Sequence, residues 1–203
     1  MKHKFFAISI FIFIVLQILV ILGSWFVTVV FPTLPVRSML SSEGIRWFLG
    51  QYTSNLASPL LVWLVLAGMT YGALRSSGLS RAIVYFSNIS YRQRFALKVV
   101  AAELIFFAIV LFLMTFLPQA ILLSVTGELF PSSFSRSLIP IVCFLLTLFS
   151  ITYGLINASF SSLTDIFNSL TSGITTISPW LVIYVFVIQL YYCLLYTSPS
   201  PRD

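Results

Sequence analysis

Residues 5–31 read FFAISIFIFIVLQILVILGSWFVTVVF, and this stretch decides the fold class. Only Gln17, Gly23 and a few hydroxyl side chains interrupt its run of apolar residues. A hydrocarbon core of about 30 Å requires about 20 apolar residues in a helix, so the run is long enough to cross a bilayer. The basic residues 2–4 precede it as in a signal peptide, but the run is too long and no small-x-small cleavage site follows. We therefore predict an uncleaved membrane helix.

The composition of the whole chain also indicates a membrane protein. Of its 203 residues, 59% are hydrophobic, only 8% are charged and 20 are phenylalanine. About a quarter of the residues in a soluble domain are charged, so this chain has too few charges to cover a surface in water. Soluble enzymes, nucleic-acid-binding proteins and secreted scaffolds are therefore excluded. The partner that composition predicts is the lipid bilayer.

Cysteine and histidine chemistry has little basis in this sequence. The two cysteines, Cys143 and Cys193, form no CxxC motif, and the one histidine is His3. No disulfide framework and no zinc or haem ligand set follows from this pattern. The sequence also contains no nucleophile–base pair, paired carboxylates, HExxH motif or glycine-rich phosphate loop. We expect no enzyme activity, no catalytic residue, no metal site and no bound cofactor.

Four further stretches approach the length of a membrane span. Working outward from residues 5–31, they are residues 59–74, 99–117, 138–155 and 179–192. The chain is therefore predicted to be an all-α integral membrane protein with about five transmembrane helices. We expect residues 1–192 to form a single membrane domain.

An amphipathic stretch precedes the second span. Ser41 is placed to cap a helix, and Glu43 lies where it favours the positive end of the helix dipole. The apolar residues that follow fall on one helix face and are Ile45, Phe48, Leu49, Tyr52 and Leu56. This pattern predicts a helix that lies at the membrane surface or packs on the bundle.

The second span itself contains a GxxxG motif, formed by Gly68 and Gly72. Small residues at this spacing let a neighbouring membrane helix approach closely. Because the motif is short and occurs often, we assign these two glycines a helix-packing role only.

The basic residues predict the orientation of the chain. Cytoplasmic connections of membrane proteins are enriched in Lys and Arg. Seven basic residues lie before the first span or between the second and third spans, without an acid in that connection, and they are Lys2, Lys4, Arg75, Arg81, Arg92, Arg94 and Lys98. We therefore expect the N-terminus and the 75–98 connection to be cytoplasmic. The net charge of +6 then reflects topology, and no nucleic-acid partner is expected.

Glu103 is the first of three candidates for a substrate or ion-relay site. It lies just inside the third span, five residues after Lys98. A carboxylate in hydrocarbon is costly and is a functional candidate by default, as a proton or ion relay. The alternative is that Glu103 lies near the cytoplasmic interface and reaches water or Lys98.

Asp165 and Asn168 are the other two candidates, in the polar stretch 157–178. Apolar residues recur there at helical spacing, and Asp165 and Asn168 fall on the opposite, polar face. The pattern favours an amphipathic helix at the membrane interface. The alternative is a re-entrant segment that lines an aqueous cavity, as in transporters.

The last eleven residues, 193–203, read CLLYTSPSPRD and break the composition of the preceding span. One reading frame of a transposase-type sequencing adapter encodes this peptide. We interpret the segment as an adapter-derived artefact and exclude it from fold reasoning. We therefore expect the natural chain to continue beyond Tyr192, so that residues 1–192 are an N-terminal fragment.

Two blocks of this sequence resemble the AbgT family of transporters. The first is SSEGIRW at residues 41–47 with LAGMTYGALRSSGL at residues 66–79, similar to the family's "LLSxEGLRW" and "GVGVAExSGL" patterns. The second contains DIFNSL at residues 165–170 and SPWLVIYVFVIQL at residues 178–190, preceded by Tyr153-Gly154. It is similar to the family's "YG…D…MS…APYxVLxFFxxQF" pattern.

The resemblance implies a secondary transporter of the inner membrane, energised by an ion gradient. Its substrate would be a small organic anion of the p-aminobenzoyl-glutamate or sulfonamide class, its coupling ion Na⁺ or H⁺, and its oligomeric state a homodimer. Family members bind substrate and cation with two re-entrant hairpins. Residues 79–97 occupy the place of the first hairpin without matching its "SNxASDxGY" pattern, and the second would follow residue 192. No substrate or cation residue is therefore carried over.

Two functions follow from these observations. The first is an ion-coupled carrier of a small organic anion that works by alternating access, represented here mainly by scaffold helices. The second is a non-transporting membrane scaffold or subunit related to the same family. The two family-like blocks favour the first, and the unmatched first hairpin favours the second.

Overall fold

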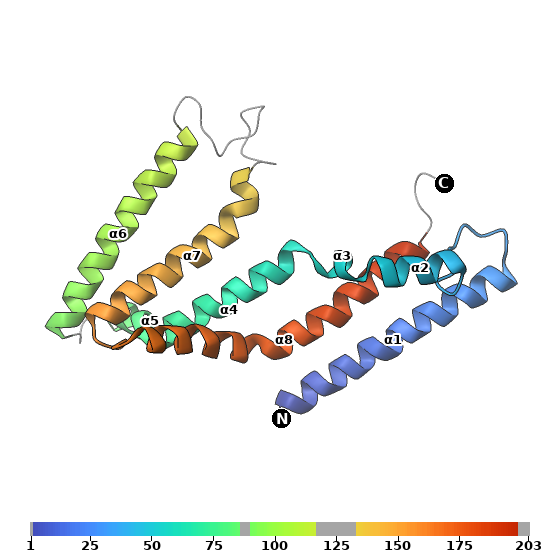
Figure 1. Cartoon of the computed structure of the whole chain (residues 1–203), viewed down its shortest axis with the longest axis horizontal. Helices are drawn as coiled ribbons and strands as arrows, with labels where there is room; N and C mark the ends of the chain where they lie inside the picture. The colour runs from blue at the N-terminus through green and yellow to red at the C-terminus, as the bar shows by residue number, and fades with distance from the viewer. Residues whose placement is uncertain (1, 86–89, 117–132, 199–203) are drawn as a thin grey trace. The chain divides into compact units, whose positions relative to one another are not determined.

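The computed structural model describes residues 2–85, 90–116 and 133–198. Residue 117 of the expected third span and residues 199–203 of the expected adapter segment lie outside these ranges. All regular structure in the described residues is helical (Figure 1). The helices are α1 (Lys2–Val30), α2 (Ser42–Gly50), α3 (Tyr52–Leu56), α4 (Pro59–Ser77), α5 (Leu79–Val84), α6 (Tyr91–Phe116), α7 (Ser133–Ile156) and α8 (Leu163–Thr197).

Five of these helices are long and apolar enough to cross a membrane, namely α1, α4, α6, α7 and α8. Their apolar side chains are widely exposed, and Phe11 on α1 is 67% exposed. Such surfaces need hydrocarbon around them, because exposed apolar area of this extent is unfavourable in water. The prediction of an all-α, multi-pass membrane protein is confirmed.

Several helices extend beyond the expected spans, and α6 and α8 differ from them most. Helix α6 begins at Tyr91, before the expected start at residue 99, because the intervening Arg, Gln and Lys residues are good helix formers. Helix α8 runs unbroken over 35 residues and joins the polar stretch 163–177 to the expected fifth span. The polar stretch is therefore helical, as its apolar spacing predicted, but it is continuous with the span that follows. Pro179 lies inside α8 and removes one backbone donor without ending the helix.

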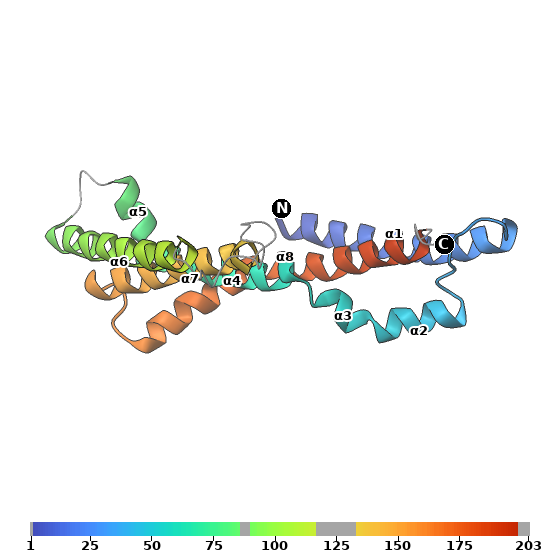
Figure 2. The same ribbon diagram turned by 90° about the horizontal axis from the view of Figure 1, so that it is seen from above.

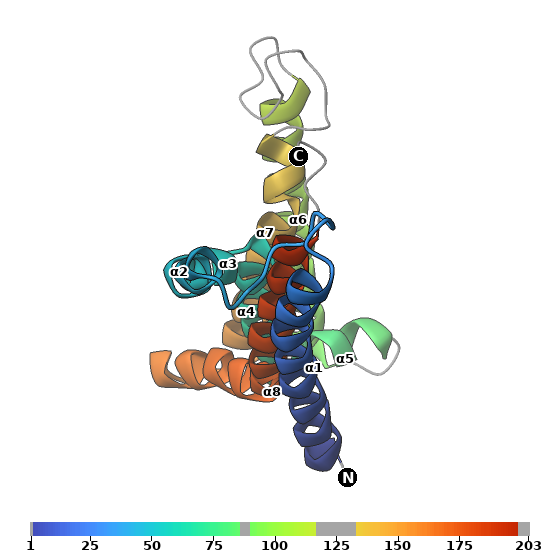
Figure 3. The ribbon, with the colours of Figure 1, turned by 90° about the vertical axis from the view of Figure 1, so that its right-hand side faces the viewer.

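The chain divides into two compact units, and the first contains residues 1–62 and 178–203. In this unit α1 lies beside the second half of α8, as Figures 2 and 3 show. Phe6 packs edge-to-face on Trp180, with ring centroids 5.5 Å apart. Near the other end of the unit, Trp47 of α2 stacks on Tyr196 at 4.6 Å. Aromatic contacts therefore connect α8 both to α1 and to α2.

The connection between α1 and α2 is held by specific hydrogen bonds. The Ser24 hydroxyl on α1 accepts from the backbone N–H of Met39 at 3.1 Å, and Met39 is buried. The Ser41 hydroxyl accepts from Gly44 N at 3.0 Å, which confirms its prediction as the cap of α2. Gly44 is required there because a Cβ would lie 2.6 Å from the Met39 carbonyl oxygen.

The joint between α3 and α4 is closed by Tyr184 of α8. Its hydroxyl donates to the Leu56 carbonyl at 2.8 Å and lies 2.6 Å from the Ser58 hydroxyl. Because the single phenol proton goes to Leu56, the Ser58 hydroxyl is the donor to Tyr184. Helix α3 ends at Leu56, whose carbonyl also accepts from Ser58 N at 2.8 Å, so the Tyr184 hydroxyl is a second donor to the same carbonyl and holds α8 against this joint.

The second unit contains residues 63–177. Its helices α6 and α7 lie side by side and run in opposite directions (Figures 1 and 2). The core between α5, α6 and α7 consists of Leu79, Ala82, Ala96, Val100, Phe149 and Tyr153. Thr70 of α4 adds a polar contact, since its hydroxyl lies 3.0 Å from that of Thr147 on α7.

Gly72 of α4 and Gly173 of α8 lie at a backbone-to-backbone contact inside the second unit. A Cβ on Gly72 would lie 2.7 Å from Gly173 N, and a Cβ on Gly173 would lie 2.7 Å from Gly72 N. A Cβ on Gly68 would lie 2.5 Å from Ile177 Cδ1. Only glycine fits at the backbone contact of Gly72 with Gly173, whereas the Ile177 side chain opposite Gly68 can move. The first half of α8 therefore packs tightly on α4.

Candidate functional site

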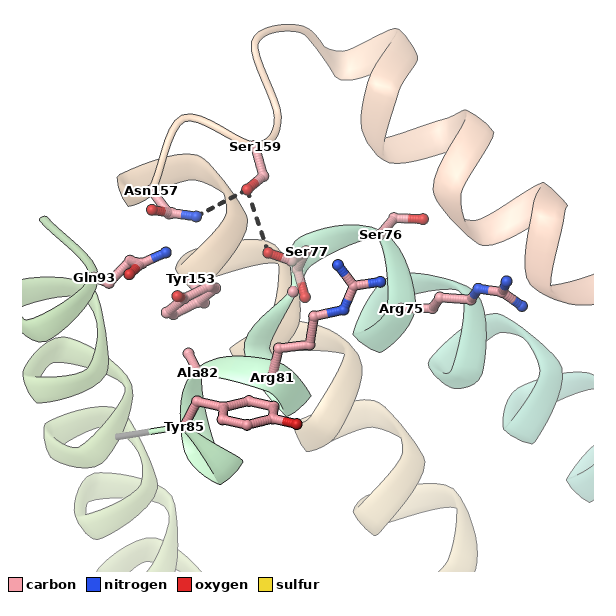
Figure 4. A pocket seen from close by; sticks show the side chains of 11 residues that line it. Arg75, Ser76, Ser77, Arg81, Ala82, Tyr85, Gln93, Tyr153, Asn157 and Ser159 are labelled. Carbon is pink, nitrogen blue, oxygen red and sulfur yellow. Dashed lines mark hydrogen bonds between the residues drawn. The ribbon is translucent and has the colours of Figure 1, made fainter. Parts of the chain in front are cut away.

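A polar hollow in the second unit lies where α4, α6 and α7 each have an end. It encloses about 370 Å³, and we call it the arginine pocket (Figure 4). Its lining residues are Arg75, Ser76, Ser77, Gly78, Arg81, Ala82, Tyr85, Gln93, Tyr153, Asn157 and Ser159. Four helices and one loop thus contribute to a single hollow.

Gly78 shapes the arginine pocket. Its φ of +77° is left-handed, a conformation that glycine adopts without strain, and it ends α4 and starts α5. The chain direction changes there, so Arg81 on α5 extends toward Ser76 and Ser77 at the end of α4 (Figure 4). Helix α5 therefore places the side chain of Arg81 beside the last turn of α4.

The loop after α7 is bound to the end of α4 by serine and asparagine side chains. The Ser159 hydroxyl donates to the Ser77 carbonyl at 3.3 Å, and Asn157 Nδ2 donates to the Ser159 oxygen at 3.0 Å. These bonds fix Asn157 on the side of the pocket opposite to Arg81 (Figure 4). The wall that faces the guanidinium is thus polar and held in place.

The arginine pocket has a positive charge. Arg75 and Arg81 contribute two guanidinium groups, and no carboxylate is among its lining residues. Arg75 Nη1 donates to the Tyr71 hydroxyl at 3.2 Å, a neutral partner that leaves the charge uncompensated. A hollow of this kind attracts an anionic oxygen group.

A second polar hollow of about 310 Å³ contains two of the three predicted site residues. We call it the serine pocket, and its lining is Ser76, Ser159, Phe160, Asp165, Asn168, Ser169 and Ser172. Asp165 and Asn168 are thus brought together on one wall. Ser76 and Ser159 line both pockets, so the two hollows are neighbours.

Asp165 is engaged at the start of α8. Its Oδ2 accepts from Ser161 N at 2.9 Å and Ser162 N at 3.0 Å, while Asp165 N donates to Ser162 Oγ at 3.2 Å. This reciprocal pair is a capping box, which satisfies backbone donors at a helix start. The contacts assign Asp165 a structural role in addition to its place in the serine pocket.

Glu103 lies apart from both pockets, on the face of α6 that meets α7. Thr152 Oγ1 of α7 donates to its Oε1 at 3.4 Å. Its Oε2 is buried and has no hydrogen-bond partner within the described residues. Within the described residues, Lys98 does not pair with the Glu103 carboxyl. A partly satisfied carboxyl between two membrane helices fits a group that exchanges a proton or an ion.

The sequence analysis missed two buried amides in the first unit. Gln189 of α8 is 2% exposed, and neither of its side-chain polar atoms has a partner in the described residues. Asn55 of α3 is also buried, and its Nδ2 is unpartnered there. Gln189 had a signal in the sequence, because it is a lone amide inside the apolar run 179–192.

Residues 2–85, 90–116 and 133–198 offer little metal-binding or thiol chemistry. Within them no group of three or more His, Cys, Asp or Glu side chains lies close enough to hold a metal ion. Cys143 and Cys193 are both free and buried. The chemistry of the described residues is therefore that of hydroxyls, amides, arginine and lysine side chains, and single carboxylates.

More than half of this chain matches the profile of a known protein family. The profile of the AbgT putative transporter family matches residues 72–198, which is more than half of the chain. This chain belongs to the AbgT family. The matched range of the AbgT profile contains Glu103 and every residue of the two pockets. Neither the curated proteins nor the solved structures include a significant match to this chain.

AbgT membership confirms the resemblance seen in the sequence. The matched range contains the second block entirely and the part of the first block from Gly72 onward. The AbgT family is a transporter family, so this chain is a multi-pass membrane protein of transporter type.

Proposed function

We propose that this AbgT chain is part of a secondary transporter for a small organic anion in the inner membrane, coupled to an ion gradient. The observation that carries the proposal is the family match over residues 72–198. The substrate class is p-aminobenzoyl-glutamate or a sulfonamide-type antimetabolite, as the family resemblance implies. The coupling ion is Na⁺ or H⁺, and we propose a homodimer as the assembled state.

The described residues support a carrier in two ways. Glu103 places a carboxyl with one unpartnered oxygen inside a candidate membrane span, and we propose that it exchanges the coupling proton or ion. The serine pocket provides a polar hollow beside the first half of α8, which contains Asp165 and Asn168. Both features supply polar groups to a fold that is otherwise apolar.

Transport by the product of the complete gene tests the proposal. That protein is reconstituted in liposomes, and uptake of labelled p-aminobenzoyl-glutamate and of a sulfonamide is measured with imposed Na⁺, H⁺ or no gradient. We expect uptake above that of protein-free liposomes, and we expect one of the two gradients to increase it. Uptake at the protein-free level under every gradient would contradict the carrier.

A second candidate function is a non-transporting membrane scaffold or subunit of the same family. Residues 79–97, which show no match to the family's first hairpin pattern, favour it. Sequencing the uninterrupted gene separates the two candidates. A carrier requires further apolar spans encoded after Tyr192, whereas a stop codon close behind Tyr192 supports the scaffold.

A further inference from the structure

The position of the arginine pocket along the membrane spans indicates what it binds. Arg75 and Ser77 lie in the last turn of α4, Gln93 lies in the first turn of α6, and Asn157 directly follows α7. All three helices are candidate spans. A hollow lined by the ends of three spans lies at the level of the lipid headgroups. The substrate site of a carrier, in contrast, lies near the midplane of the membrane.

The charge of the arginine pocket selects an anion at that level. The Arg81 guanidinium extends toward Ser76 and Ser77, while Gln93 and Asn157 line the opposite side of the hollow (Figure 4). Arg75 lies at its rim, with its guanidinium bonded to Tyr71. Arg92, Arg94 and Lys98 belong to the same basic connection, which has no Asp or Glu over residues 75–98. Basic pockets between membrane helices on the cytoplasmic side bind anionic lipid headgroups.

The surface beside the pocket is suited to acyl chains. The short helix α5 exposes three large apolar side chains next to Arg81, and Val84 is 73% exposed while Tyr85 is 69% exposed. Tyr85 also lines the pocket. A ligand with a phosphate at the arginines and hydrocarbon along α5 would cover both kinds of surface.

We propose that the arginine pocket binds the phosphate of an anionic phospholipid from the leaflet that the 75–98 connection faces. Arg75 and Arg81 contact the phosphate oxygens, and the exposed apolar residues of α5 contact the acyl chains. The proposal concerns lipid binding alone, so it is measured without a gradient and stands or falls independently of transport.

Native mass spectrometry of the full chain in a non-ionic detergent tests this binding. The probes are phosphatidylglycerol, phosphatidylcholine and inorganic phosphate. We expect phosphatidylglycerol to bind more tightly than phosphatidylcholine, and we expect inorganic phosphate at equal concentration to leave it bound. Equal affinity for the two lipids would overturn the proposal. Displacement of phosphatidylglycerol by inorganic phosphate would show that the pocket binds free phosphate and does not require a lipid.

A matched pair of double variants locates the site. One basic residue near a headgroup changes affinity about fivefold, so Arg75→Gln with Arg81→Gln should weaken phosphatidylglycerol binding about thirtyfold. The control is Arg92→Gln with Arg94→Gln, which removes the same charge from the same connection but from outside the pocket. Equal weakening by both pairs would show diffuse attraction and overturn the pocket. The lipid comparison on the unmodified chain decides the question should the first pair fail to fold.

Discussion

Glu103 has surroundings that the sequence could not specify, because they are provided by another helix. It neither pairs with Lys98 within the described residues nor lines a pocket, but contacts Thr152 on the adjacent helix. The sequence predicted that Glu103 lies just inside the third span. Only the packing of α6 on α7 shows which helix its side chain faces. A single carboxyl between two helices is a small site, and its protonation is the property to test.

We expect Glu103→Gln to reduce gradient-driven uptake at least tenfold, because an amide cannot gain or lose a proton at neutral pH. The measurement is uptake into liposomes with and without the effective gradient. The matched control is Glu43→Gln, an exposed residue in the first turn of α2. Gradient dependence that is unchanged in Glu103→Gln would remove Glu103 from the coupling mechanism.

Tyr184 joins α8 to the break between α3 and α4. Tyr184→Phe removes the donor to the Leu56 carbonyl and the acceptor of the Ser58 hydroxyl. The Leu56 carbonyl keeps its bond from Ser58 N, so the loss is that of ordinary hydrogen bonds, and the free energy of unfolding should fall by about 0.5–1.5 kcal/mol. Thermal unfolding in detergent, followed by circular dichroism, measures the change. Tyr191→Phe is the control, since Tyr191 is 56% exposed, and an equal effect of both variants would contradict the role of the hydroxyl.

At the scale of helices, the glycine contact between α4 and α8 sets their separation. Gly173→Ala inserts a methyl group against the backbone of Gly72 and should lower the free energy of unfolding by about 1–3 kcal/mol. Gly23→Ala on α1 is the matched control, because a Cβ there meets nothing within 4 Å. Thermal unfolding of both variants in detergent gives the comparison. A Gly173→Ala protein as stable as the Gly23→Ala protein would show that α4 and α8 do not pack at this point.

The helices also show how far sequence reasoning reaches. The run 5–31 determines α1 by itself, because its length and hydrophobicity are local properties. The GxxxG motif of α4 was visible in the sequence. Its contact with Gly173 was not predictable, because such a motif does not show which helix packs against it. Helix α8 has 35 residues, which corresponds to about 52 Å of helix. The apolar run 179–192, of about bilayer length, therefore predicted only the C-terminal part of this helix.

The candidate sites were less predictable than the helices. Asp165 and Asn168 were found because they share a helix face, which is a local pattern. The arginine pocket assembles residues from the ends of α4, α6 and α7 and from α5, and only tertiary packing brings them together. The sequence showed its arginines as indicators of membrane topology, but it did not predict that they line one hollow.

At the scale of the whole molecule, the orientation in the membrane stays a prediction. We expect reporters fused before Lys4 and inserted after Tyr85 to lie in the cytoplasm, because the basic residues concentrate there. A reporter inserted after Gly50, between the first and second spans, should lie on the opposite side. Protease protection or phosphatase activity of each fusion reads out its compartment. Opposite locations for the first two reporters would contradict the topology.

The division into two units has a consequence for spectroscopy. Of the four tryptophans, Trp25, Trp47 and Trp180 belong to the first unit, and Trp63 is the first residue of the second. Intrinsic fluorescence therefore reports mainly on one unit, and melting of the residues around both polar pockets would change the emission very little. An indole introduced on α6 or α7 would make that silent half of the molecule visible.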